Sequence, residues 1–326
     1  MGGLLLKKYG LESKRIDIEQ YKELESLLIQ TFANNGIELY TIPYYHSKIS
    51  FGDLDILVEK QDGLKELIQK EFNPKFIHVN DYVYSFDLNG FQIDLLAKDK
   101  EFLESARHYL GWNDISNIIG KVYNKMGLNY GWQGLKYRIK NNQNVLKEIT
   151  LTTDPQEMIE FIGYDYDEYC KGFNTIEDIY GFVTKGKYFN RDIFAFENLN
   201  NINRTRNKKR AVYSGFLDWL DKNPQVKSNF DFESVDDAYW MKKILVCFPF
   251  LNNEIKKVNQ ELELAEQRKA KFNGNLIIEW YGKNFNPQQL GEIIKDYKES
   301  KSDWNLFLDI HTKKAIEKDF IHWMEC

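Results

Sequence analysis

Three aspartates lie on apolar segments whose pattern is that of buried strands. In "SFGDLDILVEK" (50–60), Asp53 and Asp55 stand two residues apart at the start of an apolar run. Residues i and i+2 of a strand share a face, about 6.6 Å apart. Asp94 lies inside a second apolar run, "FQIDLLA" (91–97). Carboxylates gathered on one face repel one another unless a cation holds them.

Hard carboxylate oxygens are ligands that suit Mg²⁺, which binds a few carboxylates, several waters and substrate phosphates. Two such ions, about 4 Å apart, can clamp an in-line phosphoryl displacement. We therefore expect Asp53, Asp55 and Asp94 to be catalytic and to hold two Mg²⁺ ions, for which Mn²⁺ can substitute. The alternative is that Asp53 and Asp55 only face water at the end of a strand.

A hairpin is predicted to bring Asp94 to the first two aspartates. Asn89-Gly90 stands between two alternating apolar runs, 82–88 and 91–97. Both central residues of a type I′ turn need positive φ, and Asn-Gly is the pair that best adopts it. The two runs should pair antiparallel, and the second strand should lie beside the strand of Asp53.

Other local patterns indicate an α+β fold. A helix is predicted over 17–34, because Asp17 can cap it and Gln20 falls three residues later, as in a capping box. The segment 37–45 reads as a strand and 62–72 as a short amphipathic helix. We expect a mixed sheet with helices on one side.

After residue 98 the pattern changes to helices joined by polar loops. We predict a palm domain over 1–98, a nucleotide-binding helical segment over 99–145 and a helical nucleic-acid-binding region over 146–326. The polar stretch at 140–156 is expected to be a linker.

Composition excludes several classes of protein. The 326 residues carry a net charge of −5, which argues against coating nucleic acid by bulk charge. The three cysteines form no CxxC motif, which suits a reducing compartment. The longest apolar run, "ILVCFPFL" (244–251), is too short to span a bilayer. We expect a soluble cytoplasmic protein with no membrane partner.

The two aspartate motifs, "SFGDLDILV" and "FQIDLLA", resemble the palm of the polymerase-β-like nucleotidyltransferase superfamily, which includes family X DNA polymerases. The resemblance implies that Gly52 opens the nucleotide site and that Asp53 and Asp55 hold both metal ions. It further implies that Asp94 holds the catalytic ion beside a primer 3′-hydroxyl. As a whole, the chain resembles the short members coded by phages and large DNA viruses.

The segment "HYLGWNDISNIIGKVYNKMGLNY" (108–130) is similar to the nucleotide-binding segment of family X polymerases. This similarity implies that Tyr109 and Gly111 border the sugar, and that Asp114 and Asn117 lie against the base of the incoming nucleotide. The alternative is that Asp114 only caps a helix, since Asp is a common N-cap.

The chain departs from the superfamily before the first aspartate. The usual Gly-Ser pair, which grips the triphosphate, is replaced in "TIPYYHSKISFGD" by other polar residues. We expect Ser47 and Lys48 to bind the phosphates, with Ser50 and His46 as weaker candidates. Only 51 residues precede Gly52, so no N-terminal lyase domain is expected.

A basic patch in "NLNNINRTRNKKR" (198–210) is predicted to bind nucleic acid, because contacts with phosphates add affinity through counterion release. Its members are Arg204, Arg206, Lys208, Lys209 and Arg210. The alternative is a solvated charged face. The segment 271–300 weakly resembles the tail of CCA-adding tRNA nucleotidyltransferases, and the alternative there is an ordinary helical hairpin.

These residues together predict a metal-dependent nucleotidyltransferase. It would move a nucleoside monophosphate from an NTP or dNTP to a nucleic-acid 3′-hydroxyl and release pyrophosphate. A DNA primer and a tRNA or other RNA 3′ end are both possible acceptors. A transferase that modifies a small-molecule or protein hydroxyl is an alternative enzyme, and a pseudo-transferase binding module is the non-enzymatic one.

Overall fold

The structure is a computed structural model that describes residues 4–141, 144–282 and 285–326. The chain divides into two compact units, Met1–Pro249 and Phe250–Cys326. This division differs from the three domains expected from the sequence, because residues 1–98 and the segments after them belong to one unit that extends to Pro249. No helix among the described residues is long and apolar enough to cross a membrane.

The first unit contains a five-stranded mixed sheet that confirms the α+β class. Its strands, in spatial order, are β2 (Leu39–Thr41), β4 (Asp53–Glu59), β7 (Phe91–Lys98), β6 (Val83–Leu88) and β5 (Ile77–Asn80). Strands β4 and β7 are parallel, and every other pair is antiparallel. The aspartate strands are therefore direct neighbours.

The predicted hairpin is confirmed. Asn89 and Gly90 have φ of 54° and 77°, as a type I′ turn requires. Strands β6 and β7 pair antiparallel on either side of this turn, with Ser85 opposite Asp94. The turn therefore fixes the register that places Asp94.

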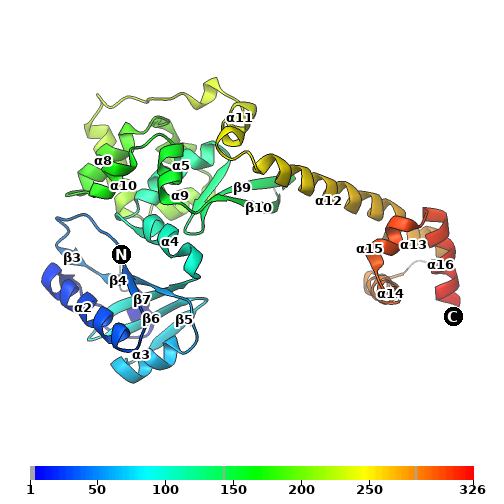
Figure 1. Cartoon of the computed structure of the whole chain (residues 1–326), viewed down its shortest axis with the longest axis horizontal. Coiled ribbons are helices and arrows are strands. Elements are labelled where there is room, and N and C mark those ends of the chain that lie inside the picture. Colours follow the sequence, from blue (N-terminus) through cyan, green and yellow to red (C-terminus); the bar gives the residue numbers. More distant parts are fainter. Residues whose placement is uncertain (1–3, 142–143, 283–284) are drawn as a thin grey trace. The chain divides into compact units, whose positions relative to one another are not determined.

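Helices cover the sheet on both faces, although the sequence predicted them on one side (Figure 1). Helix α2 (Ile18–Asn34) and helix α3 (Leu64–Phe72) pack on the face that carries Leu54 and Ile56. The capping box of Asp17 and Gln20 at the start of α2 is confirmed. The opposite face is covered in part by α4.

Helix α4 (Leu103–Leu110) packs through Leu103 and Ala106 against Leu57, which points to the same face as the aspartates of β4. Because α4 reaches only this end of the strand, Asp55 remains exposed. The aspartates of β4 thus lie at the edge of the apolar core between α4 and the sheet.

The predicted linker at 140–156 is wrong. A second, antiparallel sheet in the order β10–β9–β8 occupies this region, with bounds β8 (Leu128–Gly131), β9 (Gly134–Asn141) and β10 (Asn144–Thr152). In β9, Leu135 and Ile139 are buried, at the alternate positions that a half-buried strand requires.

The other elements of the first unit are short. They are α1 (Leu4–Lys8), β1 (Ile16–Asp17), β3 (Ser50–Phe51), α5 (Ile115–Lys125), α6 (Pro155–Phe161), α7 (Tyr166–Lys171), α8 (Ile176–Lys185), α9 (Asn201–Asn207), α10 (Ala211–Lys222) and α11 (Asp237–Cys247), with 3₁₀ turns at 100–102, 192–194, 196–198 and 232–234. The helical character predicted after residue 98 is confirmed for most of this region.

The second unit is helical and has its own core. Its helices are α12 (Leu251–Lys271), α13 (Gly274–Tyr281), α14 (Pro287–Glu299), α15 (Trp304–Ile310) and α16 (Lys313–Glu325). Phe272 and Tyr297 are central to the core. Gly274 lies so close to Leu290 that an added Cβ would be 3.0 Å from the Leu290 Cδ2 atom. Residues of the CCA-like motif thus pack this helical unit.

Candidate active site

The three aspartates gather on two adjacent strands. Asp53 and Asp55 stand on the same face of β4, and Asp94 on β7 is the parallel pairing partner of Asp55. Gln92, two residues before Asp94, donates its Nε2–H to the Asp94 Oδ2 at 2.8 Å. The second carboxylate oxygen, Asp94 Oδ1, is buried and has no partner among the described residues.

Burial and mutual repulsion perturb the carboxylates of this cluster. The Asp55 side chain is exposed, but it lines a cleft whose walls surround it. This partial burial, and then the charges of Asp53 and Asp94, raise the pKa of Asp55 to about 8. Burial also raises the pKa of Asp94, against the opposing effects of the hydrogen bonds from Ser85 and Gln92.

This donor set fits a divalent cation of the Mg²⁺ type. The orphaned Oδ1 of Asp94 and the mutual repulsion with Asp55 are both relieved by a hard cation bound to carboxylate oxygens. Within the described part of the chain, no three His, Cys, Asp or Glu side chains form a ready-made metal-binding group. Asp94 is half-buried and is not among the described residues that line the cleft.

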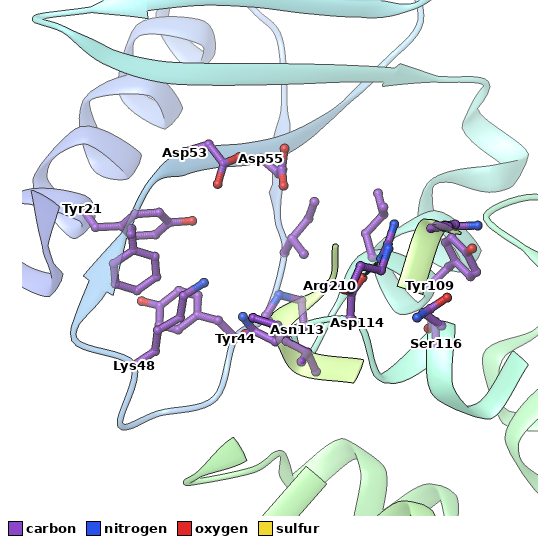
Figure 2. Close-up of a pocket in the computed structure, with 18 residues that line it drawn as sticks. Tyr21, Tyr44, Lys48, Asp53, Asp55, Tyr109, Asn113, Asp114, Ser116 and Arg210 are labelled. Carbon is purple, nitrogen blue, oxygen red and sulfur yellow. Dashed lines mark hydrogen bonds and ion pairs between the residues drawn. The ribbon is translucent and has the colours of Figure 1, made fainter. Parts of the chain in front are cut away.

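The cleft beside the aspartates has a volume of about 560 Å³ (Figure 2). Its lining comes from residues 21–55, from the α4–α5 segment and from the α9–α10 segment. The lining residues are Tyr21, Ile42, Pro43, Tyr44, Lys48, Phe51, Asp53, Asp55, Tyr109, Leu110, Asn113, Asp114, Ser116, Asn117, Arg206, Arg210, Ala211 and Val212. Residues 21–55 and the two later segments therefore contribute to one site.

An aromatic cluster lies next to the acidic strands. The ring of Tyr21 stacks on Phe51 with a centroid distance of 4.0 Å, and Tyr44 meets Phe51 edge-on at 4.9 Å. The Nζ atom of Lys48 lies 4.5 Å from the centroid of the Phe51 ring. Burial lowers the pKa of Lys48, while the charges of Asp53 and Asp55 oppose that shift.

Of the residues expected to bind phosphates, Lys48 lines the cleft and Ser47 does not. Ser47 is exposed, and its backbone N–H donates to the Asn174 carbonyl oxygen at 2.8 Å. Gly52 is buried and is not among the residues that line the cleft. His46 bonds through Nδ1 to Asn174 Oδ1 at 3.0 Å, so the loop before β4 is tied to residue 174.

Ser50, the other weaker candidate, is bonded to Arg15. Its Oγ accepts from Arg15 Nε at 2.9 Å, and its carbonyl oxygen accepts from Arg15 Nη2 at 2.8 Å. These contacts lie outside the cleft lining, so the structure places Lys48 alone of this group beside the aspartates.

The two residues expected to border the sugar differ, because Tyr109 faces the cleft and Gly111 does not. Tyr109 lines the cleft and meets the Tyr130 ring edge-on at 5.2 Å. Gly111 does not line it but packs on Pro43, where an added Cβ would lie 2.9 Å from the Pro43 Cγ atom. Glycine is required there by this close approach.

The turn into α5 has an unusual backbone. Trp112, Asn113 and Asp114 are three consecutive non-glycine residues with positive φ of 52°, 51° and 68°. Such residues are uncommon, and their conformations are typical of functional sites. Asp114 precedes α5 but makes no side-chain capping bond. The turn therefore directs its side chain away from a capping role.

Helix α5 binds the α9–α10 segment through three polar pairs. Asp114 forms an ion pair with Arg210. One turn along, Asn117 Nδ2 donates to Asn207 Oδ1 at 3.0 Å. A further turn along, Lys121 Nζ donates to Asn203 Oδ1 at 3.3 Å. The first two pairs border the cleft, so Asp114 and Asn117 face it while bonded to another segment. None of these three pairs was predicted from the sequence.

The five residues of the predicted basic patch have separate environments. Arg204 donates to the backbone carbonyl oxygens of Phe196, Glu197 and Leu199, so its guanidinium stabilises a loop. Arg206 and Arg210 line the cleft.

The remaining two members of the patch, Lys208 and Lys209, are exposed and do not line the cleft. These environments could not be separated from the sequence, because all five residues fall within one short polar run.

Models of known protein families give no match to the chain, and neither do curated proteins. The family resemblance therefore depends on the motif residues alone.

Proposed function

We propose that the protein is a metal-dependent nucleotidyltransferase that moves a nucleoside monophosphate from an NTP or dNTP to a hydroxyl group. The observation that carries this proposal is the pairing of Asp55 with Asp94 on adjacent parallel strands, with Asp53 two residues away. A cleft that also carries Lys48 and two arginines lies beside them. Opposite charges on facing parts of one cleft suit a nucleotide with its cations.

Asp53, Asp55 and Asp94 would hold Mg²⁺, or Mn²⁺ in its place. When bound, the ions would lower the pKa of the attacking hydroxyl and neutralise the phosphates. The acceptor oxygen forms a bond to the α-phosphorus, the bond from that phosphorus to the bridging oxygen breaks, and pyrophosphate leaves. Asp94, whose Oδ1 is buried and unpaired, would help to hold the ion that activates the hydroxyl, and the hydroxyl proton would pass to solvent in the cleft.

The cleft residues around the reacting atoms would orient the nucleotide. The cluster of Tyr21, Tyr44 and Phe51 offers flat apolar surface close to the aspartates. Lys48 lies over the same cluster and supplies a positive charge beside Asp53 and Asp55. Such surroundings exclude water and fix a reactant, which is the main role left to protein groups in phosphoryl transfer.

We propose a nucleic-acid 3′ end as the acceptor, either a DNA primer or an RNA end. One observation favours the alternative of a small-molecule or protein hydroxyl. Arg204 is bonded internally and Arg206 and Arg210 face the cleft, so Lys208 and Lys209 are the members of the patch left on the outer surface. Two lysines contribute a small share of the phosphate contacts that nucleic-acid binding uses.

The test is an assay of nucleotide incorporation. The purified chain would be supplied with Mg²⁺ or Mn²⁺, with the four ribonucleotides and four deoxyribonucleotides labelled at the α-phosphate, and with primer, template–primer and tRNA acceptors. We expect metal-dependent transfer of the label to one acceptor class. Label on the protein itself or on an added small molecule would support the alternative acceptor, and no transfer in any arm would contradict the proposed function.

A further inference from the structure

The cleft beside the aspartates has walls of opposite charge. Asp53 and Asp55 project from β4, and Arg210 lies across the space from them, next to Asp114 (Figure 2). Arg206 lines the same cleft. We call Arg206 and Arg210 the arginine wall. The wall comes from the α9–α10 segment, and Arg206 follows Asp94 by more than 100 residues in the sequence.

The arginine wall carries more positive charge than its neighbours neutralise. Arg206 has no hydrogen bond or ion pair from its side chain among the described residues. Lys121 is buried behind the wall, and its pKa is lowered to about 8 by burial and then by the charges of Arg206 and Arg210. Against these three cations, Asp114 supplies one carboxylate, through its ion pair with Arg210.

A bound polyanion would relieve this imbalance. Arginine presents a planar fork of donors that matches phosphate oxygens, and such charge-assisted bonds are strong in a partly dry site. The palm loop before β4 contributes Lys48 to the cleft, whereas Ser47 and Gly52 lie outside its lining. The phosphates of a nucleotide in this cleft therefore need donors from another part of the chain.

Building on the proposed function, we propose that Arg206 and Arg210 bind the polyphosphate chain of the nucleotide. We further propose that Asp114 is an internal competitor of that chain, which holds Arg210 when the cleft is empty and exchanges it for phosphate when nucleotide enters. Both partners of the ion pair line the cleft, so a ligand can reach the bond. The assignment replaces the expectation that Arg210 contacts the nucleic-acid acceptor.

The experiment measures binding by isothermal titration calorimetry with inorganic tripolyphosphate as the probe. It uses full-length protein that carries Asp53→Asn, Asp55→Asn and Asp94→Asn, without divalent cations, so that neither catalysis nor metal binding contributes. Arg206→Gln and Arg210→Gln in this background should each weaken binding at least about tenfold, the loss expected for one charge-assisted contact. Lys222→Gln, an exposed lysine at the end of α10 that lies outside the cleft lining, is the matched control and should leave affinity unchanged.

The competitor role makes a prediction of opposite sign. Asp114→Asn should tighten tripolyphosphate binding severalfold, because Arg210 no longer has to leave a carboxylate. Unchanged or weaker binding by Asp114→Asn would overturn the competitor role. If Arg210→Gln alone does not fold, because it leaves Asp114 unpaired, the double variant Asp114→Asn with Arg210→Gln removes both charges. Its affinity should still fall below that of Asp114→Asn alone.

A parallel titration with a single-stranded oligonucleotide that lacks a terminal triphosphate separates this inference from acceptor binding. Loss of oligonucleotide affinity in both arginine variants, with tripolyphosphate affinity unaltered, would overturn the inference in favour of an acceptor site. The proposed function is tested separately. Arginine-dependent tripolyphosphate binding by a protein that transfers no nucleotide would leave this inference standing and contradict nucleotidyl transfer. Nucleotide transfer by the wild-type protein, with tripolyphosphate binding unaltered in both arginine variants, would contradict this inference and leave the proposed function standing.

Discussion

Asp55 and Asp94 occupy paired positions on the parallel strands β4 and β7. The pairing places two carboxylates side by side, with Asp53 on the same face, and one oxygen of Asp94 is left without a partner among the described residues. Such an arrangement destabilises the folded chain unless a cation or a proton neutralises it. This pairing is the observation on which the proposed cation-dependent function rests.

Removal of one carboxylate should abolish stabilisation by metal. Mg²⁺ or Mn²⁺ should raise the thermal midpoint of the wild-type protein, because a ligand that binds only the folded state stabilises it. Asp55→Asn should lose this response, yet without metal it should be as stable as wild type or more so, since one repulsive charge is gone. Differential scanning fluorimetry with and without EDTA measures both effects. Asp81→Asn, at an exposed turn with φ of 58°, is the control. A full metal response in Asp55→Asn would contradict the metal site.

Lys48→Met should weaken nucleotide use. The substitution keeps the length and apolar body of the side chain but removes the positive charge beside Asp53 and Asp55. We expect kcat/KM for the nucleotide to fall about tenfold, as for one lost charge-assisted contact. Steady-state kinetics of wild type and of Lys65→Met, an exposed lysine on α3, provide the comparison. Equal kinetics for all three proteins would place Lys48 outside the reaction.

Asn117→Ala should reduce stability as well as nucleotide affinity. Its amide donates to Asn207 Oδ1, and Asn207 is fully buried with its own Nδ2 already unpartnered among the described residues. The substitution would leave the Asn207 side chain without a hydrogen-bond partner among the described residues and should cost about 1–3 kcal/mol of unfolding free energy. Urea denaturation measures this loss. A variant as stable as wild type but with a raised KM would show that Asn117 serves the nucleotide alone.

Buried His108 should make the fold sensitive to acid. Burial lowers the pKa of His108 to about 4, from an ordinary value of about 6.5. Because the pKa of His108 is lower in the folded than in the unfolded protein, protonation of His108 favours unfolding. Its contribution to the stability of the folded state is complete above pH 6.5 and is lost as the pH falls through 4. The expected total is about 3 kcal/mol, from the size of the shift. His108→Gln should show a shallower dependence of unfolding free energy on pH over this range, whereas His46→Gln, at an exposed position, should match wild type. An unaltered pH dependence in His108→Gln would contradict this assignment.

Local rules predicted the acidic strands because each step depended on residues close in sequence. The type I′ turn at Asn89-Gly90 set the register of β7, and the spacing of Asp53 and Asp55 set their common face. The sheet at 128–152 was missed, although Leu135 and Ile139 alternate with polar residues in β9. The polar run that follows them is typical of a linker, and it obscures this alternation.

The arginine wall could not be predicted from the same rules. Asp114 meets Arg210 across 96 residues, and Asn117 meets Asn207 across 90. Neither pair has a local pattern that specifies its partner, because tertiary packing of α5 on the α9–α10 segment decides it. The sequence identified the charged residues of 198–210, and the fold divided them between a loop, a cleft and the outer surface.

The central claim is tested most directly by the effect of Asp94→Asn on metal-dependent release of pyrophosphate from nucleoside triphosphates in the presence of a hydroxyl acceptor. The substitution preserves the shape of the side chain and removes one charge. We predict that wild-type protein releases pyrophosphate and labels the acceptor with Mg²⁺ or Mn²⁺. We further predict that folded Asp94→Asn protein is slower by more than about 10³, the scale of a lost catalytic group. Near wild-type turnover by folded Asp94→Asn protein would contradict the account.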